Sequence, residues 1–202
     1  MLRPLAFLSD AVLVEGVRAN RRAAIEAFYD RYSAHVIRVL GRVLGFEREL
    51  ADLHHEVFVK ALESISELRD PDALKPWLTS IAVFTARTCI QKRTRGRWLR
   101  FFATDELPDR PAATASDEIG EALRYTYWAL DQLPAEERIA FALRIIDGME
   151  LTEVAEACGC SLATVKRRLS KAEAAFTKIA RNHPVLAEWI EGGGRWGSLA
   201  SH

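Results

Sequence analysis

The stretch from residue 158 to residue 171, CGCSLATVKRRLSK, combines two kinds of side chain that could do chemistry. Cys158 and Cys160 place two thiols on either side of a glycine, a spacing that a metal or redox site could use. The residues that follow turn cationic, with Lys166 and Arg167 adjacent, which suits contact with nucleic-acid phosphates. The elements around the stretch decide between these two chemistries.

A metal site would need more ligands than this stretch supplies. Tetrahedral zinc takes four ligands, and the other histidines and cysteines form no second spaced pair: His35, His54, His55, His183 and Cys89. The chain has three cysteines and no visible secretory signal, which is typical of a reducing, cytoplasmic compartment with free thiols. We therefore expect no metal and no cofactor. We expect the two cysteines to act as small buried apolar side chains.

The apolar spacing around the stretch predicts a helix-turn-helix. Residues 151–158 carry an apolar side, Gly159 permits a tight turn, and Ser161 can cap the next helix by accepting from its free amides. Val165 and Leu169 belong to the inner stripe of that second helix. Its outer side would enter the major groove of DNA and carries the residues that we expect to contact DNA: Ser161, Thr164, Lys166, Arg167, Ser170 and Lys171.

Charge is segregated along the chain. Lys plus Arg and Asp plus Glu number 28 each, so the formal net charge is zero. Residues 87–100 nevertheless carry only cations, residues 103–121 are mostly acidic, and residues 161–178 are mostly cationic again. Such blocks indicate local electrostatic roles. Apolar residues make up 49% of the chain, and no window approaches the roughly 18 apolar residues of a membrane span, so no membrane insertion is expected.

The apolar residues recur at helical steps almost throughout, and no segment shows strand alternation. Asp70-Pro71 interrupts a first helical region, and a stretch rich in proline, small and acidic residues follows that region. A second helical region has Pro134 near a helix start and Gly148 at a helix end. We expect an all-α protein with two small helical domains at 11–102 and 119–182, a flexible acidic linker at 103–118 and a flexible tail at 183–202.

The order of these parts resembles the sigma factors of bacterial RNA polymerase, in the small two-domain extracytoplasmic-function (ECF) group of the sigma-70 family. AAIEAFYDRY resembles the first helix of the sigma-2 domain, ADLHHEVFVKAL its D-L-x-Q-E-x-F-x-x-A helix, and LKPWLTSIA its F-x-x-W-L-x-x-I-A segment. Residues 129–172 resemble the sigma-4 domain nearly end to end. The resemblance covers about residues 11–182.

The resemblance implies a transcription initiation factor, not an enzyme, that binds core RNA polymerase and directs it to promoters by reading minus-10 and minus-35 elements. Asp52 and Glu56 would dock on the clamp helices of the β′ subunit, and the sigma-4 domain would also meet the β flap. An anti-sigma protein is a further candidate partner. The outer face of the second helix-turn-helix helix would read the minus-35 element. Recognition and opening of the minus-10 element would fall to Arg69, Phe84, Arg87, Thr88, Gln91, Lys92 and Arg95.

Some positions depart from the family pattern or leave alternatives open. His54 and His55 replace an apolar–Gln pair, and we expect exposed substitutions, with a pH-sensitive contact as the alternative. Phe84 stands where the family often has asparagine, so its ring could stack on a base or turn into the core. Trp77 is expected in the core. Arg168 lies close to the inner stripe and is either phosphate-binding or structural.

Two other functions fit parts of the chain. A sigma mimic that sequesters an anti-sigma protein would not need the cationic outer face of KRRLSK. A stand-alone helix-turn-helix repressor would not need the DLHHEVF helix or the acidic linker. The sequence contains no recognisable Gly-rich phosphate loop, nucleophile elbow or paired-carboxylate site.

Overall fold

Helices make up nearly all of the part of the chain that this computed structural model describes, residues 9–45, 49–101, 118–184 and 186–187. No strand occurs among these residues, so the all-α prediction is confirmed. None of the helices described there has the length and apolar character needed to cross a membrane. The α-helices are α1 Asp10–Arg18, α2 Arg22–Leu44, α3 Leu50–Ser64, α4 Leu74–Phe101, α5 Glu118–Leu130, α6 Ala135–Phe141, α7 Leu151–Cys158 and α8 Leu162–Arg181.

The first unit consists of α1–α4. Helix α2 ends at Gly45, whose φ of +86° is a conformation that glycine adopts without strain. The turn before α4 begins at Asp70, whose side chain accepts a hydrogen bond from the amide of Asp72. Trp77 packs against the core, as expected. The centre of this unit is built from the inner stripes of α2, α3 and α4, including Phe28, Val36, Val57, Leu74, Leu78 and Ala82.

The second unit consists of α5–α8. A short π-helical turn, Ala142–Ile146, extends α6, and Gly148 with φ +81° ends it. The ring of His183 lies 3.7 Å from the ring of Tyr125, centroid to centroid, and Leu186 is buried. The structure therefore differs from the predicted flexible tail at His183 and Leu186. Most of the predicted linker, residues 103–117, and the predicted tail from residue 188 onward lie outside the described residues.

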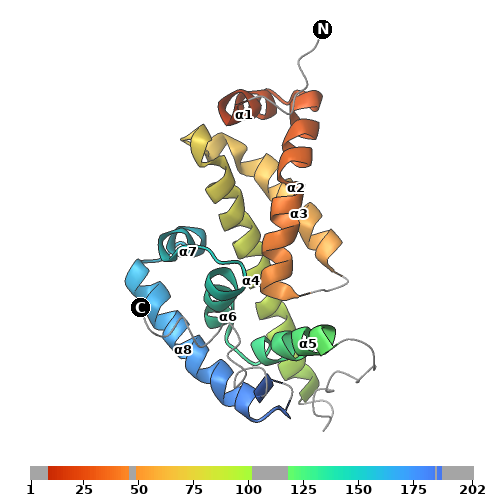
Figure 1. Ribbon diagram of the computed structural model, residues 1–202. Coiled ribbons are helices and arrows are strands. Elements are labelled where there is room, and N and C mark those ends of the chain that lie inside the picture. Colours follow the sequence, from red (N-terminus) through yellow and green to blue (C-terminus); the bar gives the residue numbers. More distant parts are fainter. Residues whose placement is uncertain (1–8, 46–48, 102–117, 185, 188–202) are drawn as a thin grey trace.

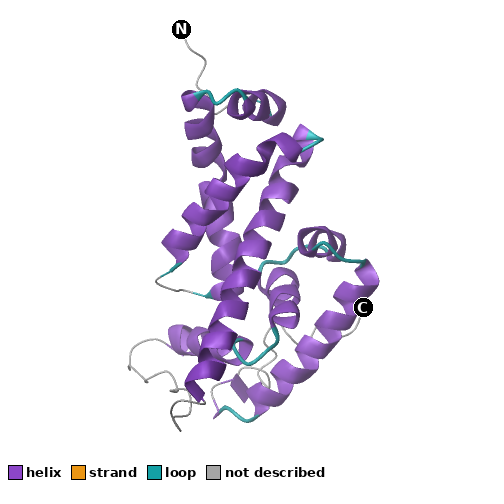
Figure 2. Ribbon diagram, turned by 180° about the vertical axis from the view of Figure 1, so that it is seen from behind, coloured by secondary structure: helices purple, strands orange, loops and turns teal. Residues whose placement is uncertain are grey.

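The two units pack directly against each other, which the sequence does not predict. Helix α4 contacts α6 and α7, and α2 contacts the π-helical turn. Both views show α6 and α7 beside the long α2–α4 bundle (Figure 1, Figure 2). One cluster of buried apolar side chains runs through both units and includes Leu13 of α1 and Leu169 of α8, while a second cluster, with Leu130 and Phe176, lies within the second unit. The units therefore share a core in addition to the covalent connection.

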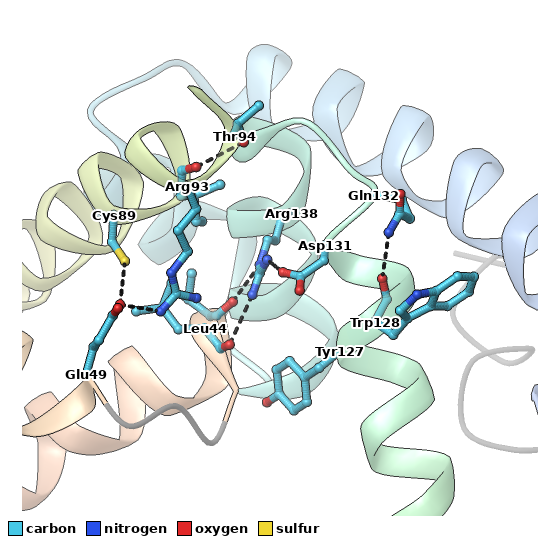
Figure 3. Close-up of polar contacts among 12 residues, drawn as sticks. Leu44, Glu49, Cys89, Arg93, Thr94, Tyr127, Trp128, Asp131, Gln132 and Arg138 are labelled. Carbon is cyan, nitrogen blue, oxygen red and sulfur yellow. Dashed lines mark hydrogen bonds and ion pairs between the residues drawn. The ribbon is translucent and has the colours of Figure 1, made fainter. Parts of the chain in front are cut away.

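The C-terminus of α2 is one point where the second unit attaches. The last carbonyl groups of a helix have no partner within the helix. Arg138 of α6, which is 2% exposed, donates from Nε to the Val43 carbonyl at 2.9 Å and from Nη2 to the Leu44 carbonyl at 3.1 Å, as Figure 3 shows. The hydroxyl of Tyr127 donates to the Gly41 carbonyl at 3.0 Å. A guanidinium at this position also suits the negative end of the helix dipole.

Candidate nucleic-acid interface

Helices α7 and α8 form the predicted helix-turn-helix. Helix α7 begins with a capping box in which the Glu153 carboxylate accepts from the amide of Glu150 at 2.8 Å. It ends at Gly159, whose φ of +63° is left-handed. The Ser161 hydroxyl then accepts from the amide of Thr164 at 3.2 Å and satisfies one of the free amides at the start of α8. These local signals set where α8 begins and hence which of its side chains face outward.

The outer face of α8 is cationic and exposed over its first turns. Lys166, Arg167, Ser170 and Lys171 are all exposed. Thr164 is only half-buried, and its Oγ1 lies 3.0 Å from the exposed Ser161 hydroxyl, so both hydroxyls take part in the cap. The opposite side of α8 enters the core through apolar residues, including Val165, Leu169, Ala172 and Phe176. The helix thus separates an apolar inner side from a cationic outer side.

The two cysteines at the turn behave differently. Cys158 is buried, and burial raises the pKa of its thiol to about 11, so the thiol is protonated near neutral pH. Cys160 is half-buried, and Nη1 of Arg168 lies 3.4 Å from its sulfur. Within the described residues, no three His, Cys, Asp or Glu side chains gather as a metal site would require. Gly159 makes the turn, and the sulfurs flank it.

A second polar face lies along α4. Residues 84, 88, 91 and 95 recur at steps of four, three and four, which puts Phe84, Thr88, Gln91 and Arg95 on one side of the helix. Thr88 is half-buried and the other three are exposed, as is Lys92 beside them. The structure therefore answers the question that the sequence leaves open about Phe84: its ring faces outward, 54% exposed, and does not enter the core. Arg69, before the turn that leads into α4, is also exposed.

Arg87, expected at the DNA, is instead held by the second unit. Its Nε lies 2.7 Å from Oε1 of Glu136, and its Nη2 lies 3.4 Å from the Cys158 carbonyl. Arg168 of α8 reaches the same carboxylate, with Nη2 at 2.7 Å from Oε2 of Glu136. One carboxylate therefore joins an arginine of α4 to an arginine of α8. In this conformation Arg168 has a structural role, one of the two alternatives left by the sequence.

Helix α3 presents the acids expected to bind the polymerase. Asp52 is exposed, and Glu56 is half-buried with Oε1 at 2.6 Å from Nζ of Lys60. The expectation that His54 is exposed is wrong: it is buried, with Nε2 at 3.0 Å from the Ser33 hydroxyl. Burial lowers the pKa of His54, because a charged ring would lose its hydration.

His54 is enclosed by aromatic rings, and its neighbour is not. The ring of His54 lies 5.4 Å from that of Tyr29 and 5.1 Å from that of Phe58, centroid to centroid. His55, one position on, is exposed as expected. The apolar residue of the family pattern at position 54 thus corresponds to an inward-facing position, and its place in the α3 stripe with Leu50, Val57 and Ala61 was the available signal.

Sequence reasoning missed Glu136, Arg138 and Lys60. Each acts between segments far apart in the chain or between two helices, and none belongs to a local motif. The available signal for Arg138 was its helical spacing, because it lies three and four positions before the buried Phe141 and Ala142. Nothing in the sequence indicates that Glu136 would meet arginines from both α4 and α8.

These features define a class: a helical protein with a helix-turn-helix and two exposed polar helix faces suited to nucleic acid. Family comparison identifies it more closely. A family model described as Sigma-70 region 2 matches residues 28–107, and one described as Sigma-70, region 4 matches residues 126–176. The chain belongs to the sigma-70 family of RNA polymerase sigma factors, in its ECF group.

Curated relatives match over most of their length. The RNA polymerase sigma-H factor of Pseudomonas aeruginosa is 28% identical over 193 residues, covering 89% of this chain and 96% of the relative. The ECF RNA polymerase sigma-E factor of Escherichia coli K12 is 27% identical over 178 residues, covering 84% of this chain and 93% of the relative.

Solved structures share the fold at low identity. CnrH, in complex with the cytosolic domain of CnrY, matches with a TM-score of 0.59 at 20% identity, covering 87% of this chain and 99% of that chain. The sigma factor RpoE of Bartonella quintana, in complex with the anti-sigma factor NepR, matches with a TM-score of 0.52 at 21% identity. The match covers 76% of this chain and 94% of that chain.

Proposed function

We propose that this chain is a transcription initiation factor that binds core RNA polymerase as a dissociable subunit and directs it to promoters. The observation that carries the proposal is the combination, on one chain, of the two sigma-70 regions with two exposed polar faces, on α4 and α8. It acts in the cytoplasm, where polymerase and DNA meet, and catalyses no reaction of its own. The domain division is the one the sequence suggests, with residues 11–102 and 119–182 as the two working parts.

The face of α8 reads the minus-35 element. Lys166, Arg167 and Lys171 contact phosphates or base edges, because exposed cations near the start of a helix-turn-helix recognition helix lie at the major groove. Ser170 supplies a hydroxyl on the same face, and the Ser161 and Thr164 hydroxyls lie at the helix start. Contacts with phosphates supply affinity, while contacts with base edges supply selectivity.

The face of α4 meets the minus-10 element. Gln91, Lys92 and Arg95 are exposed along it, Phe84 and Thr88 continue it, and Arg69 stands beside the turn that leads into it. Arg87 joins this set once it is released from Glu136.

Promoter binding requires the two units to separate. Glu136 is within 2.7 Å of arginines from both α4 and α8, so these two helices approach closely at that point. The minus-10 and minus-35 elements lie about 25 base pairs apart, or roughly 85 Å along B-DNA at about 3.4 Å per pair. The packed arrangement cannot place both faces on their elements at once. It also occupies Arg87 and Arg168 with a carboxylate, where DNA would offer phosphates.

Helix α3 docks on the β′ clamp helices through Asp52 and Glu56, and the second unit meets the β flap. An anti-sigma protein is the regulatory partner that we propose, since a solved structure with this fold is a complex with an anti-sigma factor.

The test is reconstitution. Core polymerase with and without this protein transcribes fragmented genomic DNA of the source organism, and the transcript starts are mapped. We expect starts that share two sequence elements and that are absent with core polymerase alone. Tight binding to an anti-sigma protein without start selection would favour the sigma mimic. Sequence-specific DNA binding that needs no polymerase would favour the repressor.

A further inference from the structure

We infer that Arg18 of α1 is a positioning residue for promoter selection, because it fixes the backbone of the turn between α3 and α4 that carries Arg69. Residues 65–73, the α3–α4 turn, include two short 3-10 helices, Ile65–Glu67 and Pro71–Ala73. The inference rests on the proposed function, which places Arg69 at the minus-10 element. It goes further by giving a part in promoter selection to α1, which lies before residue 28, where the family match begins.

The guanidinium of Arg18 binds two backbone carbonyl groups of the α3–α4 turn. Its Nε donates to the Ile65 carbonyl at 3.4 Å, and its Nη2 donates to the Leu68 carbonyl. Its Nη1 pairs with Glu15, one turn earlier on the same helix, at 2.9 Å. All three nitrogens of one planar group are therefore engaged, and two of them hold the turn. A lysine ammonium lacks this fork and could not bind both carbonyls in the same way.

The carbonyl of Leu68 is directly connected to Arg69. Ile65 and Leu68 are each 5% exposed, so their side chains anchor the α3–α4 turn in the core. Arg69 is the next residue and is exposed. The Leu68 carbonyl that Arg18 binds belongs to the peptide bond from which Arg69 begins. A shift of that carbonyl therefore changes the direction in which the Arg69 side chain leaves the backbone.

Helix α1 is itself fixed on α2 at two places. The Asp10 carboxylate, at the start of α1, accepts from the Tyr32 hydroxyl at 2.7 Å. Near its other end, Gly16 lies so close to α2 that a Cβ there would be 2.5 Å from Cβ of Ala24. The two helices can approach this closely only because residue 16 has no side chain. Helix α1 thus holds Arg18 at a set place beside the α3–α4 turn, as Figure 1 shows.

The hold on the turn bears on selectivity more than on affinity. An arginine that reads a base edge must meet its acceptors in a fixed orientation, whereas a contact with a phosphate carries no sequence information. A displaced Arg69 would still be a cation near DNA, but it would no longer distinguish one base pair from another. A contribution of Arg18 to stability alone would instead lower binding to all promoters together.

The experiment uses the holoenzyme, this protein with core polymerase, on a promoter mapped in the reconstitution. Each base pair of the minus-10 element is substituted in turn, and open-complex formation on the native promoter is divided by that on the substituted one. This discrimination ratio is measured for the wild type, Arg69→Ala and Arg18→Lys. The base pair that Arg69 reads is the one at which Arg69→Ala loses a wild-type ratio of about 5- to 150-fold, the usual range for one mismatched pair.

Arg18→Lys should lose most of the discrimination ratio at that same base pair. Its affinity for core polymerase and its discrimination at the minus-35 element should stay as in the wild type. Combining Arg18→Lys with Arg69→Ala should add no further loss, because Arg18 acts through Arg69. Arg22→Lys makes the same exchange at an exposed arginine of α2 that pairs with Glu26, and as the control it should keep every wild-type ratio.

A second pair of variants moves α1 without changing Arg18. Gly16→Ala pushes α1 away from α2, so it should also lose the ratio at the base pair that Arg69 reads. Adding Ala24→Gly removes the opposing methyl group and should recover the ratio. These variants decide the matter if Arg18→Lys is too unstable to form a holoenzyme.

The outcomes separate the inference from the proposed function. A wild-type ratio at every base pair in Arg18→Lys overturns the inference, as does a loss that falls equally on the minus-10 and minus-35 elements. If Arg18→Lys forms no holoenzyme, wild-type ratios in Gly16→Ala overturn it instead. If Arg69→Ala changes no ratio although the wild type selects starts, the inference fails and the proposed function stands. If the wild type selects no start, the proposed function fails, and the inference with it.

Discussion

Arg138 Nε donates a hydrogen bond of 2.9 Å to the carbonyl of Val43, joining residues 95 positions apart in the chain. The side chain is 2% exposed, and its Nη1 also pairs with Asp131 of its own unit. A buried guanidinium must be fully paired, because its desolvation is otherwise uncompensated. The end of α2 supplies that pairing through carbonyl groups that its own helix cannot use. The second unit therefore depends on the first for the satisfaction of a buried charge.

Arg138→Ala should lower the free energy of unfolding by about 2–4 kcal/mol, because it leaves two carbonyl groups at the end of α2 without this donor and removes one ion pair of Asp131. Urea unfolding of the full chain measures the loss. Arg138→Lys should recover only part of it, since one ammonium cannot reproduce the fork that reaches both Val43 and Leu44. Arg124→Ala, at an exposed arginine of α5, is the control. Equal stability of Arg138→Ala and Arg124→Ala would contradict the assigned role.

The sequence predicts what local physics determines. The start of α8 follows from Gly159 and Ser161, and its inner stripe from apolar spacing, so the exposure of Lys166 and Arg167 could be predicted. The contacts of Arg87 could not, because its partner Glu136 lies in another unit and either residue alone looks like an ordinary surface charge. A similar limit explains why His54 was expected to be exposed. The family pattern has an apolar residue at that position, but the sequence does not show that a buried histidine there would find a hydrogen-bond partner in Ser33 of another helix.

Reversing two carboxylates should separate the units. Glu136 faces Arg87 and Arg168, while Asp147 lies 3.5 Å from Arg38 and 3.9 Å from Arg42. The double variant Glu136→Lys with Asp147→Lys places a lysine against arginines at both contacts, so the attraction between the opposite charges becomes repulsion between like charges. Small-angle scattering should show the radius of gyration rise above the roughly 17 Å of a compact chain of this length.

The matched control is Glu137→Lys with Glu156→Lys, which makes the same change in net charge within the second unit. It should stay compact. The opened variant should also bind promoter DNA more tightly without polymerase, because α4 and α8 are no longer held together. If Glu136→Lys with Asp147→Lys also stays compact, the shared apolar core, and not these ion pairs, holds the two units together.

The cations of α8 should govern the salt dependence of promoter binding. Lys166→Ala with Arg167→Ala should reduce the slope of log K against log salt by about two, at roughly 0.9 for each phosphate that the variant no longer neutralises. Holoenzyme binding to duplex promoter DNA at several salt concentrations measures it. Lys178→Ala with Arg181→Ala removes the same charge from the last turn of the same helix and should change little. Equal slopes for the two variants would place the minus-35 contact elsewhere.

Docking on the polymerase should depend on α3 at two separable positions. Asp52→Lys should weaken binding to core polymerase at least tenfold, since it sets like charges against a basic partner face. Glu56→Gln should weaken it less, because it nearly keeps the size of the side chain and keeps an acceptor for Lys60. Fluorescence anisotropy with labelled protein gives both affinities. The control is Glu26→Lys, which makes the same charge reversal at an exposed acid of α2. If it weakens binding to core polymerase as much as Asp52→Lys does, α3 is not the docking helix.

Acid should destabilise the first unit through His35. The Thr79 hydroxyl donates its one hydrogen to the Lys75 carbonyl at 2.9 Å, so His35 Nε2 is the donor in the 2.7 Å bond between them. Its Nδ1 then accepts from Arg38 at 3.3 Å. A second proton on the ring would face that guanidinium. Burial first, then Lys75 and Arg38, lower the pKa of His35 from 6.5 to about 4, while Asp147 opposes the shift.

Because the folded-state pKa is depressed, the unfolded chain binds the extra proton between pH 6.5 and about 4. The contribution to stability is therefore complete above pH 6.5 and is lost as the pH falls toward 4, by about 1–2 kcal/mol after allowance for solvent screening of a half-buried ring. Urea unfolding at pH 7.5 and pH 4.5 should show a smaller difference for His35→Gln, which keeps an N–H donor for Thr79. His55→Gln, at an exposed histidine, should retain the full difference. If His35→Gln loses as much stability on acidification as the wild type, His35 is not the group that titrates, and the buried His54 becomes the one to replace.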